Sequence, residues 1–215
     1  MMLYDCRTMA DRDRGIAAAV DAAKSGELVV FPTDTVYGVG ADAFTAHAVR
    51  SLHSARGMDQ QIAPPVLVGS RHTLDGLVYS LPKAARELAD AFWPGALTLL
   101  VEHSPSLQWD LGETDGVVAV RMPLHPVALE VLREVGPMAV TTANKVGSAA
   151  PVTAEEAREQ LEYSVRVYLE AGAAADPAPS TIVDLTGDAP KVVRNGAIPL
   201  EKLRDVVPDI VAAEA

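Results

Sequence analysis

The stretch "LVVFPTDTVYGVGADAF" (residues 28–44) changes character in its middle, and the rest of the chain can be interpreted outward from it. Residues 28–31 are apolar and predict a buried strand. Pro32 follows, and then a Thr-Asp-Thr run at positions 33–35. Short polar side chains at a strand end either close a turn or face a ligand. The remaining strands must distinguish these two interpretations.

Strand and helix patterns alternate irregularly on either side of this stretch. Helical spacing and capping residues predict helices over residues 11–25, 46–54, 81–95, 125–136, 153–161 and 199–207. Apolar runs predict strands over residues 28–31, 65–68, 96–102, 117–121, 138–142, 165–169, 180–185 and 191–194. Because strands also come in runs, a mixed α/β sheet flanked by helices is favoured over a parallel doubly wound sheet.

Length and composition bound the organisation of the chain. Its 215 residues are 49% hydrophobic, which suits one large domain with a sizeable core. We therefore expect a single domain over residues 1–215, in which residues 199–215 form a short C-terminal helix and tail. The stretch 171–180 predicts a surface loop.

Charge and cysteine content exclude several classes of function. The net charge of −11 argues against broad nucleic-acid binding, which requires basic surface. Cys6 is the only cysteine, so no intrachain disulfide can form and a cytoplasmic location is favoured. The sequence contains neither a secretory signal nor an apolar run of the ~20 residues that a membrane helix needs. The five histidines are scattered without ligand-like spacing, and no metal-binding residues are predicted.

The glycines of "YGVGADA" (37–43) superficially resemble a dinucleotide-binding motif. That motif places its first glycine directly at a strand end, where a phosphate meets a helix N-terminus. Residues 32–37 instead separate Phe31 from Gly38. We interpret Gly38 and Gly40 as residues that permit a tight backbone path.

Other predicted strands also end in hydroxyl, amide or guanidinium groups. These are Thr33 and Thr35, Arg121, Thr141 and Thr142 with Asn144, Ser180 and Thr181, and Arg194. Each alone is more often a cap or a turn residue. Together they could line one cavity, in which arginines bind phosphate or carboxylate and hydroxyls orient a polar ligand. With no nucleophile elbow or paired carboxylates, the pattern indicates positioning rather than a covalent intermediate.

At this point the chain resembles the YrdC-like threonylcarbamoyl-AMP synthases in their short single-domain form. The segments that carry the resemblance follow the family's order and cover nearly the whole chain: "FPTDTVYGVGADA", "FWPGALTLL", "VAVRMPLHPVAL", "GPMAVTTAN", "STIVDLTG" and "VVRNGAI". The resemblance implies a twisted mixed sheet around a deep cavity. It also implies a reaction of L-threonine, bicarbonate and ATP, with Mg2+, that gives threonylcarbamoyl-AMP and pyrophosphate for tRNA modification.

The resemblance also implies roles for individual residues. A substrate-binding role falls to Thr33, Thr35, Arg121 and Thr181. A nucleotide-binding role falls to Arg56, Thr142, Asn144, Ser180 and Arg194. A catalytic role falls to Arg56 and Arg194. A separate tRNA threonylcarbamoyl transferase is implied as the downstream partner, and whether the chain itself contacts tRNA is left open.

One segment departs from the family's pattern. In "SARGMDQQIAPPVLVGS" (54–70), Arg56 stands where the family has Lys, and Met58 stands where it has Arg. Losing one charge-assisted contact to a triphosphate would cost ~1.5–3 kcal/mol, and a Met58→Arg change would then restore activity. Lys145 could supply the missing charge, or it could be an exposed loop lysine.

Two other functions compete with a working synthase. One is a specialised or weakened paralogue that forms a carbamoyl-type adenylate for another acceptor. The other is a non-catalytic module that binds a nucleotide or RNA. Arg121, Asn144 and Arg194 argue against a dead site, and the acidic charge argues against general RNA binding.

Overall fold

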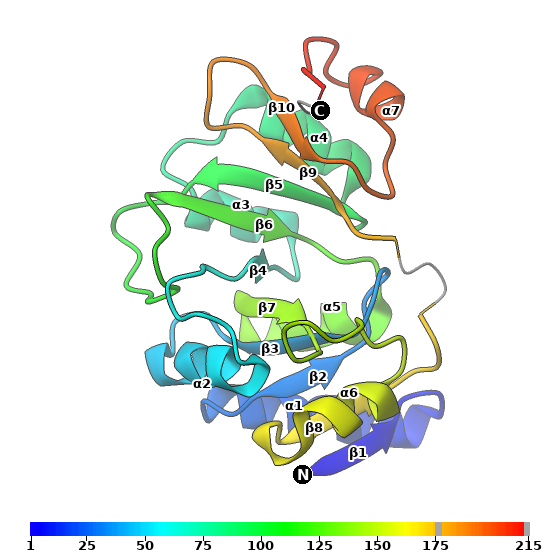
Figure 1. The fold of residues 1–215 in the computed structure, drawn as a ribbon. Helices are drawn as coiled ribbons and strands as arrows, with labels where there is room; N and C mark the ends of the chain where they lie inside the picture. Colours follow the sequence, from blue (N-terminus) through cyan, green and yellow to red (C-terminus); the bar gives the residue numbers. More distant parts are fainter. Residues whose placement is uncertain (175–177, 213–215) are drawn as a thin grey trace.

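A twisted, ten-stranded sheet runs through the computed structural model, which describes residues 1–174 and 178–212 (Figure 1). In sheet order, the strands are β1 (Met2–Asp5), β8 (Val167–Glu170), β2 (Val29–Phe31), β3 (Gly38–Asp42), β7 (Met138–Thr142), β4 (Val66–Leu67), β6 (Val117–Arg121), β5 (Leu97–Glu102), β9 (Thr181–Asp184) and β10 (Lys191–Arg194). Parallel pairs (β1 with β8, β8 with β2, β4 with β6, β5 with β9) are mixed with antiparallel ones. The predicted mixed sheet is confirmed.

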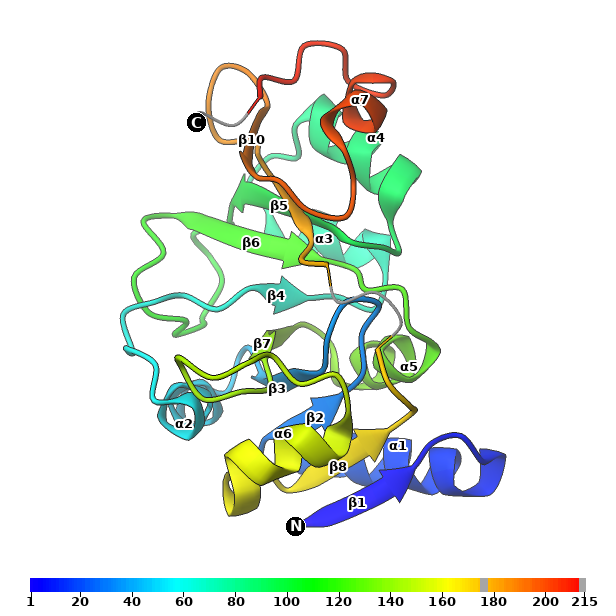
Figure 2. The same cartoon turned by 45° about the vertical axis from the view of Figure 1, so that its right-hand side comes forward.

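Helices cover both faces of this sheet. They are α1 (Met9–Lys24), α2 (Ala46–Arg56), α3 (Arg71–Leu77), α4 (Lys83–Phe92), α5 (Pro126–Val135), α6 (Ala154–Leu161) and α7 (Leu200–Arg204), with a 3-10 turn η1 (Glu162–Ser164) after α6. In the half of the sheet that contains β8, β2 and β3, α1 and α5 lie on one face and α6 lies on the other (Figure 2). None of the helices in the described ranges is long and apolar enough to cross a bilayer.

Strand alternation explains why β2 is apolar throughout. Val29 and Phe31 pack on one face with residues of α1 and α5, while Val30 packs on the other face with Tyr168 and residues of α6. All three β2 side chains are buried because both faces of this strand are covered. Beyond the carboxyl end of such a strand the chain leaves the sheet, and the Thr-Asp-Thr run begins there.

The glycine-rich stretch after this run is a strand, β3, which the sequence did not predict. A Cβ atom on Gly38 would lie 2.8 Å from Cγ1 of Val140, and one on Gly40 would lie 3.1 Å from Cγ2 of the same residue. The glycines therefore allow β3 to fit between β2 and β7. A dinucleotide-binding turn is excluded here, because α2 begins only at Ala46.

Two elements, β1 and α3, add to the predicted set. β1 extends the sheet at one edge, and α3 precedes α4; neither was predicted. The last predicted helix is shorter than expected, and Val211 then pairs with Lys191 of β10. Residues 175–177 of the predicted surface loop and residues 213–215 of the predicted tail lie outside the described residues.

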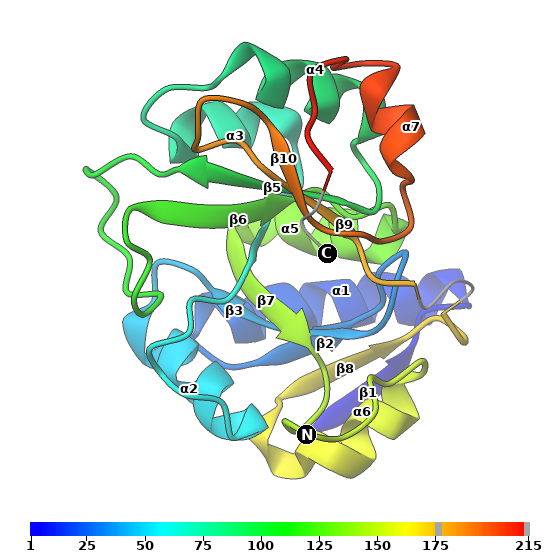
Figure 3. The same cartoon turned by 45° about the horizontal axis from the view of Figure 1, so that its top comes forward.

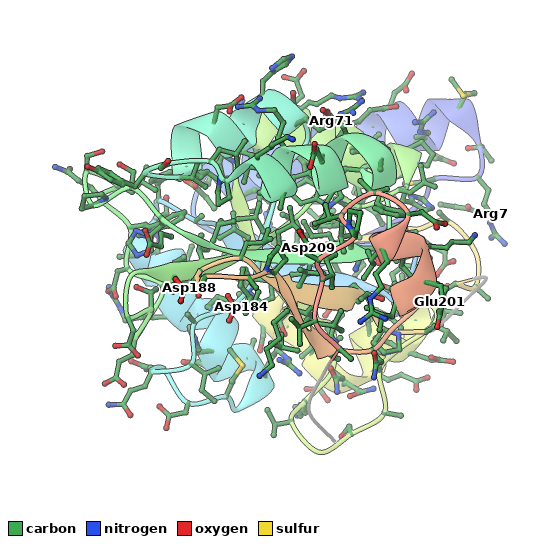
Figure 4. The ribbon with its side chains drawn as sticks, turned by 90° about the horizontal axis from the view of Figure 1, so that it is seen from above. Arg7, Arg71, Asp184, Asp188, Glu201 and Asp209 are labelled. Carbon is green, nitrogen blue, oxygen red and sulfur yellow. The ribbon has the colours of Figure 1, made fainter. Side chains whose placement is uncertain are left out.

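Charged side chains such as Arg7, Arg71 and Glu201 lie on the outside of the molecule (Figure 4).

Candidate active site

A cavity of about 380 Å3 opens where the ends of several strands meet. Its polar lining consists of hydroxyl and guanidinium groups: Thr33, Thr35, Tyr37, Thr98, Arg121, Thr141, Thr142, Ser180 and Arg194. Its apolar lining includes Val36, Pro65, Leu67, Ala119, Val140, Ala150, Pro179 and Ile182. These residues come from strands that are far apart in the sequence, so the sheet gathers most of the predicted strand-end groups; Asn144 and Thr181 do not line the cavity.

Arg121 ends β6 and is held in place by three neighbours. Its Nε donates to the Gly95 carbonyl at 3.0 Å, its Nη1 to Thr35 Oγ1 at 3.2 Å, and its Nη2 to Asp34 Oδ1 at 2.7 Å. Burial lowers the pKa of the Arg121 guanidinium, and the Asp34 carboxylate acts in the opposite direction. A guanidinium carries five N–H groups, so in the described part of the chain two remain for a ligand.

The hydroxyls of Thr33 and Thr35 form a directed chain that starts at Arg121. Thr33 Oγ1 donates to the Val36 carbonyl at 2.6 Å, and so it can only accept from Thr35, whose Oγ1 lies 3.1 Å away. Thr35 Oγ1 in turn accepts from Arg121. Both protons are therefore used within the protein, and Thr35 keeps one lone pair that can accept a hydrogen bond from a ligand.

Arg194 and Ser180 form a second cluster with Thr98. Arg194 donates from Nε to the Ser180 carbonyl at 3.0 Å and from Nη2 to Ser180 Oγ at 2.8 Å. Ser180 Oγ also lies 2.8 Å from Thr98 Oγ1. The Arg194 side chain is partly exposed, and the burial of its guanidinium lowers the pKa. Among the described residues no partner is present for its three other N–H groups, which can bind a ligand at the rim of the cavity.

Arg56 lies just behind the cavity wall and is 9% exposed. Its nitrogens donate to Thr141 Oγ1 at 2.6 Å, to Thr142 Oγ1 at 3.0 Å, and to both the carbonyl and Oδ1 of Asn144 at 2.8 and 3.0 Å. Met58 Sδ accepts the fifth bond at 3.5 Å. Arg56 and Asn144 are thus beside the site as expected, but they do not line it.

Thr181 is the one predicted substrate residue that the structure turns away from the cavity. Its neighbours Ser180 and Ile182 line the cavity, and alternation along β9 directs Thr181 to the opposite side. Its hydroxyl donates to the Ile198 carbonyl at 2.7 Å and accepts from the Ile198 amide at 3.0 Å. These bonds give Thr181 a role in holding the segment after β10.

Asp34 and Thr98 are residues of the site that the sequence did not predict. Asp34 lies within the Thr-Asp-Thr run, but only the fold shows that its carboxylate meets Arg121 and the Leu124 amide, at 2.7 and 2.9 Å. Thr98 lies inside a predicted strand, and its only signal was a hydroxyl in an otherwise apolar run. In register it pairs with Arg121 on β6 and with Ile182 on β9, which places it between the two clusters.

The loop that follows β7 continues to α6 (Figure 3). Lys145 in this loop is exposed and is not part of the cavity lining, while its backbone amide donates to Gln160 Oε1 at 3.1 Å. Ala150 from the same loop does line the cavity. In the part of the chain that the structure describes, no three His, Cys, Asp or Glu side chains are grouped to hold a metal ion.

Comparison with known proteins places this geometry in a family. The family model of Sua5, YciO and YrdC, described as "Telomere recombination", matches residues 21–196. The chain belongs to the Sua5/YciO/YrdC family. The cavity with its strand-end hydroxyls and arginines is therefore the candidate site of a member of this family.

The relatives of this Sua5/YciO/YrdC chain carry a consistent name. A Mycobacterium tuberculosis protein named "Putative threonylcarbamoyl-AMP synthase" is 58% identical over 95% of this chain and 94% of its own length. The threonylcarbamoyl-AMP synthase of Pyrococcus abyssi is 33% identical over 91% of this chain and 58% of its own length. The P. abyssi Sua5 structure, complexed with L-threonine, matches with a TM-score of 0.92 and 31% identity; it covers 99% of this chain, which spans 62% of the Sua5 chain.

Proposed function

We propose that this chain is a threonylcarbamoyl-AMP synthase, which converts L-threonine, bicarbonate and ATP to threonylcarbamoyl-AMP and pyrophosphate. The observation that carries the proposal is the number of hydrogen-bond donors that the cavity offers to a ligand. Among the described residues, two arginines, Arg121 and Arg194, each keep free N–H groups for an anion, in separate clusters that line one cavity. A substrate with one carboxylate and a second with a phosphate chain match this arrangement.

The bonds of the reaction define what the cavity must do. The threonine nitrogen bonds to the carbon of bicarbonate with loss of water, and the resulting carbamate oxygen bonds to the α-phosphorus of ATP. The bond from the α-phosphorus to the bridging oxygen breaks, and pyrophosphate leaves. No enzyme nucleophile is required, so catalysis consists of alignment and charge stabilisation.

Arg121 and Thr35 fit the amino-acid substrate. The two free N–H groups of Arg121 would bind its carboxylate, and the free lone pair of Thr35 would accept from its amine or hydroxyl. Thr33 supports Thr35 from behind. Nearby apolar side chains such as Leu67 and Val140 exclude water from the reacting carbamate.

Arg194, Ser180 and Thr142 fit the nucleotide. Arg194 can bind a phosphate through its free N–H groups while Ser180 fixes its orientation. Mg2+ prefers carboxylate, phosphate and water oxygens, and among the residues that the structure describes the cavity lining contains hydroxyls but no carboxylate. We therefore assign magnesium to the substrate MgATP, in which the phosphates supply its ligands.

The cellular setting follows from the same proposal. The product is a reactive mixed anhydride, so a tRNA threonylcarbamoyl transferase is proposed as the partner that consumes it. A cytoplasmic location and a single domain over residues 1–215 belong to this proposal as well.

Product analysis tests the function directly. The purified protein is incubated with MgATP, bicarbonate and L-threonine, and threonylcarbamoyl-AMP is measured by mass spectrometry together with pyrophosphate. We expect both products, and we expect each to require all three substrates. Pyrophosphate release with a different amino acid would instead indicate a retuned paralogue. Absence of release with any amino acid would favour a binding module.

A further inference from the structure

The guanidinium of Arg56 has no N–H group left for a ligand. Its five donors meet five acceptors, all of them neutral: Thr141 Oγ1, Thr142 Oγ1, the carbonyl and Oδ1 of Asn144, and Met58 Sδ. Burial alone lowers the pKa of Arg56, and no carboxylate among residues 1–174 and 178–212 forms an ion pair with it. The chain therefore keeps an uncompensated cation directly behind the cavity wall.

The two threonine hydroxyls that Arg56 contacts, in contrast, still have a proton to donate to a ligand. Thr141 Oγ1 and Thr142 Oγ1 each accept a hydrogen bond from the guanidinium, at 2.6 and 3.0 Å, and both residues line the cavity. Neither hydroxyl proton meets an acceptor within the described part of the protein. Because the lone pairs face the cation, each O–H bond is polarised and its proton is directed away from Arg56.

The surrounding loop prevents Arg56 from turning into the cavity. Asn144 accepts two of its bonds and donates from Nδ2 to the Ser148 carbonyl at 2.7 Å. The carbonyl of Arg56 accepts from the Val146 amide at 2.9 Å, so the loop is tied to the end of α2 from both sides. Direct contact with a ligand would require several of these bonds to break.

We propose that Arg56 is a positioning residue, and that the protons of Thr141 and Thr142 make the contact with the anionic phosphates of the nucleotide. The positive charge reaches the ligand through the two hydroxyls, which it orients and polarises. Met58 completes this arrangement by accepting the remaining N–H, so a second basic residue at that position is not needed. This inference rests on the proposed function only in naming the anion as part of ATP.

The test is calorimetric titration of inorganic pyrophosphate and of MgATP into single variants. Thr142→Val and Thr141→Val remove a proton donor at nearly constant volume, whereas Thr142→Ser and Thr141→Ser keep it. We expect each valine variant to bind pyrophosphate about tenfold or more weakly, and each serine variant to stay within about threefold of the wild type. Binding of pyrophosphate by the valine variants at wild-type affinity would overturn the proposal.

A double-mutant cycle separates the indirect role from direct contact. Arg56→Lys is measured in the wild type and in the Thr141→Val/Thr142→Val background, with Arg50→Lys on the exposed side of α2 as the matched control. If Arg56 acts through the hydroxyls, its replacement weakens pyrophosphate binding in the wild type and has little further effect without them. An equal loss in both backgrounds would show direct contact and contradict the proposal.

The result is distinguishable from failure of the proposed function, because pyrophosphate binding does not depend on product formation. A protein that shows the hydroxyl dependence but forms no threonylcarbamoyl-AMP would retain this inference and lose the function. A protein that forms the product but binds pyrophosphate equally in all threonine variants would do the reverse. Failure of the wild type to bind pyrophosphate would contradict the inference outright.

Discussion

Two arginine–threonine clusters border the same cavity, and they differ in how many N–H groups of the arginine are left for a ligand. In the first, Arg121 bonds to Asp34, Gly95 and Thr35, and two of its N–H groups stay free. In the second, Arg56 spends all five N–H groups on neutral acceptors. Counting donors thus separates an arginine that can bind a ligand itself from one that acts through its neighbours.

The threonines differ in the same way. Thr33 and Thr35 use their protons within the protein and offer a lone pair, which suits an ammonium or hydroxyl donor on the ligand. Thr141 and Thr142 offer protons, which suit an anion. Identical side chains at two strand ends therefore acquire opposite hydrogen-bonding roles, because the neighbouring arginine approaches a different set of partners.

The largest expected effect comes from removing the ligand-binding arginine. Arg121→Ala would eliminate the two charge-assisted bonds that we propose to the threonine carboxylate, so we expect the KM for threonine to rise about a hundredfold or more. The KM for ATP should change by less than about threefold, because Arg56 and Arg194 are untouched. Steady-state kinetics with each substrate varied in turn measures both constants. A rise in the KM for ATP alone would break the comparison.

Arg194→Ala should have the next largest effect, and on the other substrate. It removes the exposed guanidinium that we propose binds the phosphates, so kcat/KM for ATP should fall about ten- to a hundredfold. Arg204→Ala, a change of an exposed arginine on α7, serves as the control. Equal losses in the two variants would show that Arg194 contributes only general surface charge.

Thr98→Val tests the link between Arg121 on β6 and the cluster formed by Arg194 and Ser180. The change removes the hydroxyl that lies 2.8 Å from Ser180 Oγ, which loosens Arg194 without touching it. We expect kcat/KM for ATP to fall about three- to tenfold, a loss that corresponds to one neutral hydrogen bond. Thr98→Ser should restore most of it. Failure of serine to rescue would assign the effect to packing of β5 instead.

Met58→Arg and Lys145→Ala should have the smallest effects. The family resemblance alone predicts that Met58→Arg raises activity, but the structure predicts less than about a twofold gain. The reason is that Arg56 already supplies the charge, and a second guanidinium beside it would be repelled. Lys145 is exposed and outside the lining, so Lys145→Ala should also stay within about twofold. A tenfold gain in Met58→Arg would restore the direct-contact interpretation of this segment.

Much of the fold could be predicted because most strands are short apolar runs with recognisable ends. β3 could not, since Gly38 and Gly40 disfavour strands in isolation. The segment forms a strand by pairing with β2 and β7, and it contains glycines because a Cβ atom at either position would crowd Val140. β1 is a short edge strand, and its pairing with β8 joins residues far apart in the sequence. Such tertiary constraints are absent from local sequence patterns.

The site, like the fold, could be predicted from the sequence only in part. Strand-end hydroxyls and arginines identified the cavity, because strand ends gather at a sheet edge. The sequence could not show that Thr181 faces away, since a one-residue difference along β9 decides the side. Nor could it show how many N–H groups of Arg56 are occupied, which depends on Asn144 and Thr142 from a distant strand end.

A crystal structure of the protein with L-threonine and a non-hydrolysable MgATP analogue tests the central claim most directly. We expect the threonine carboxylate within hydrogen-bond distance of Arg121 and a phosphate oxygen within hydrogen-bond distance of Thr141 or Thr142 Oγ1. The bonds from Arg56 to Thr141, Thr142 and Asn144 should all remain. A structure in which Arg56 has left Asn144 and donates to a phosphate would contradict the account.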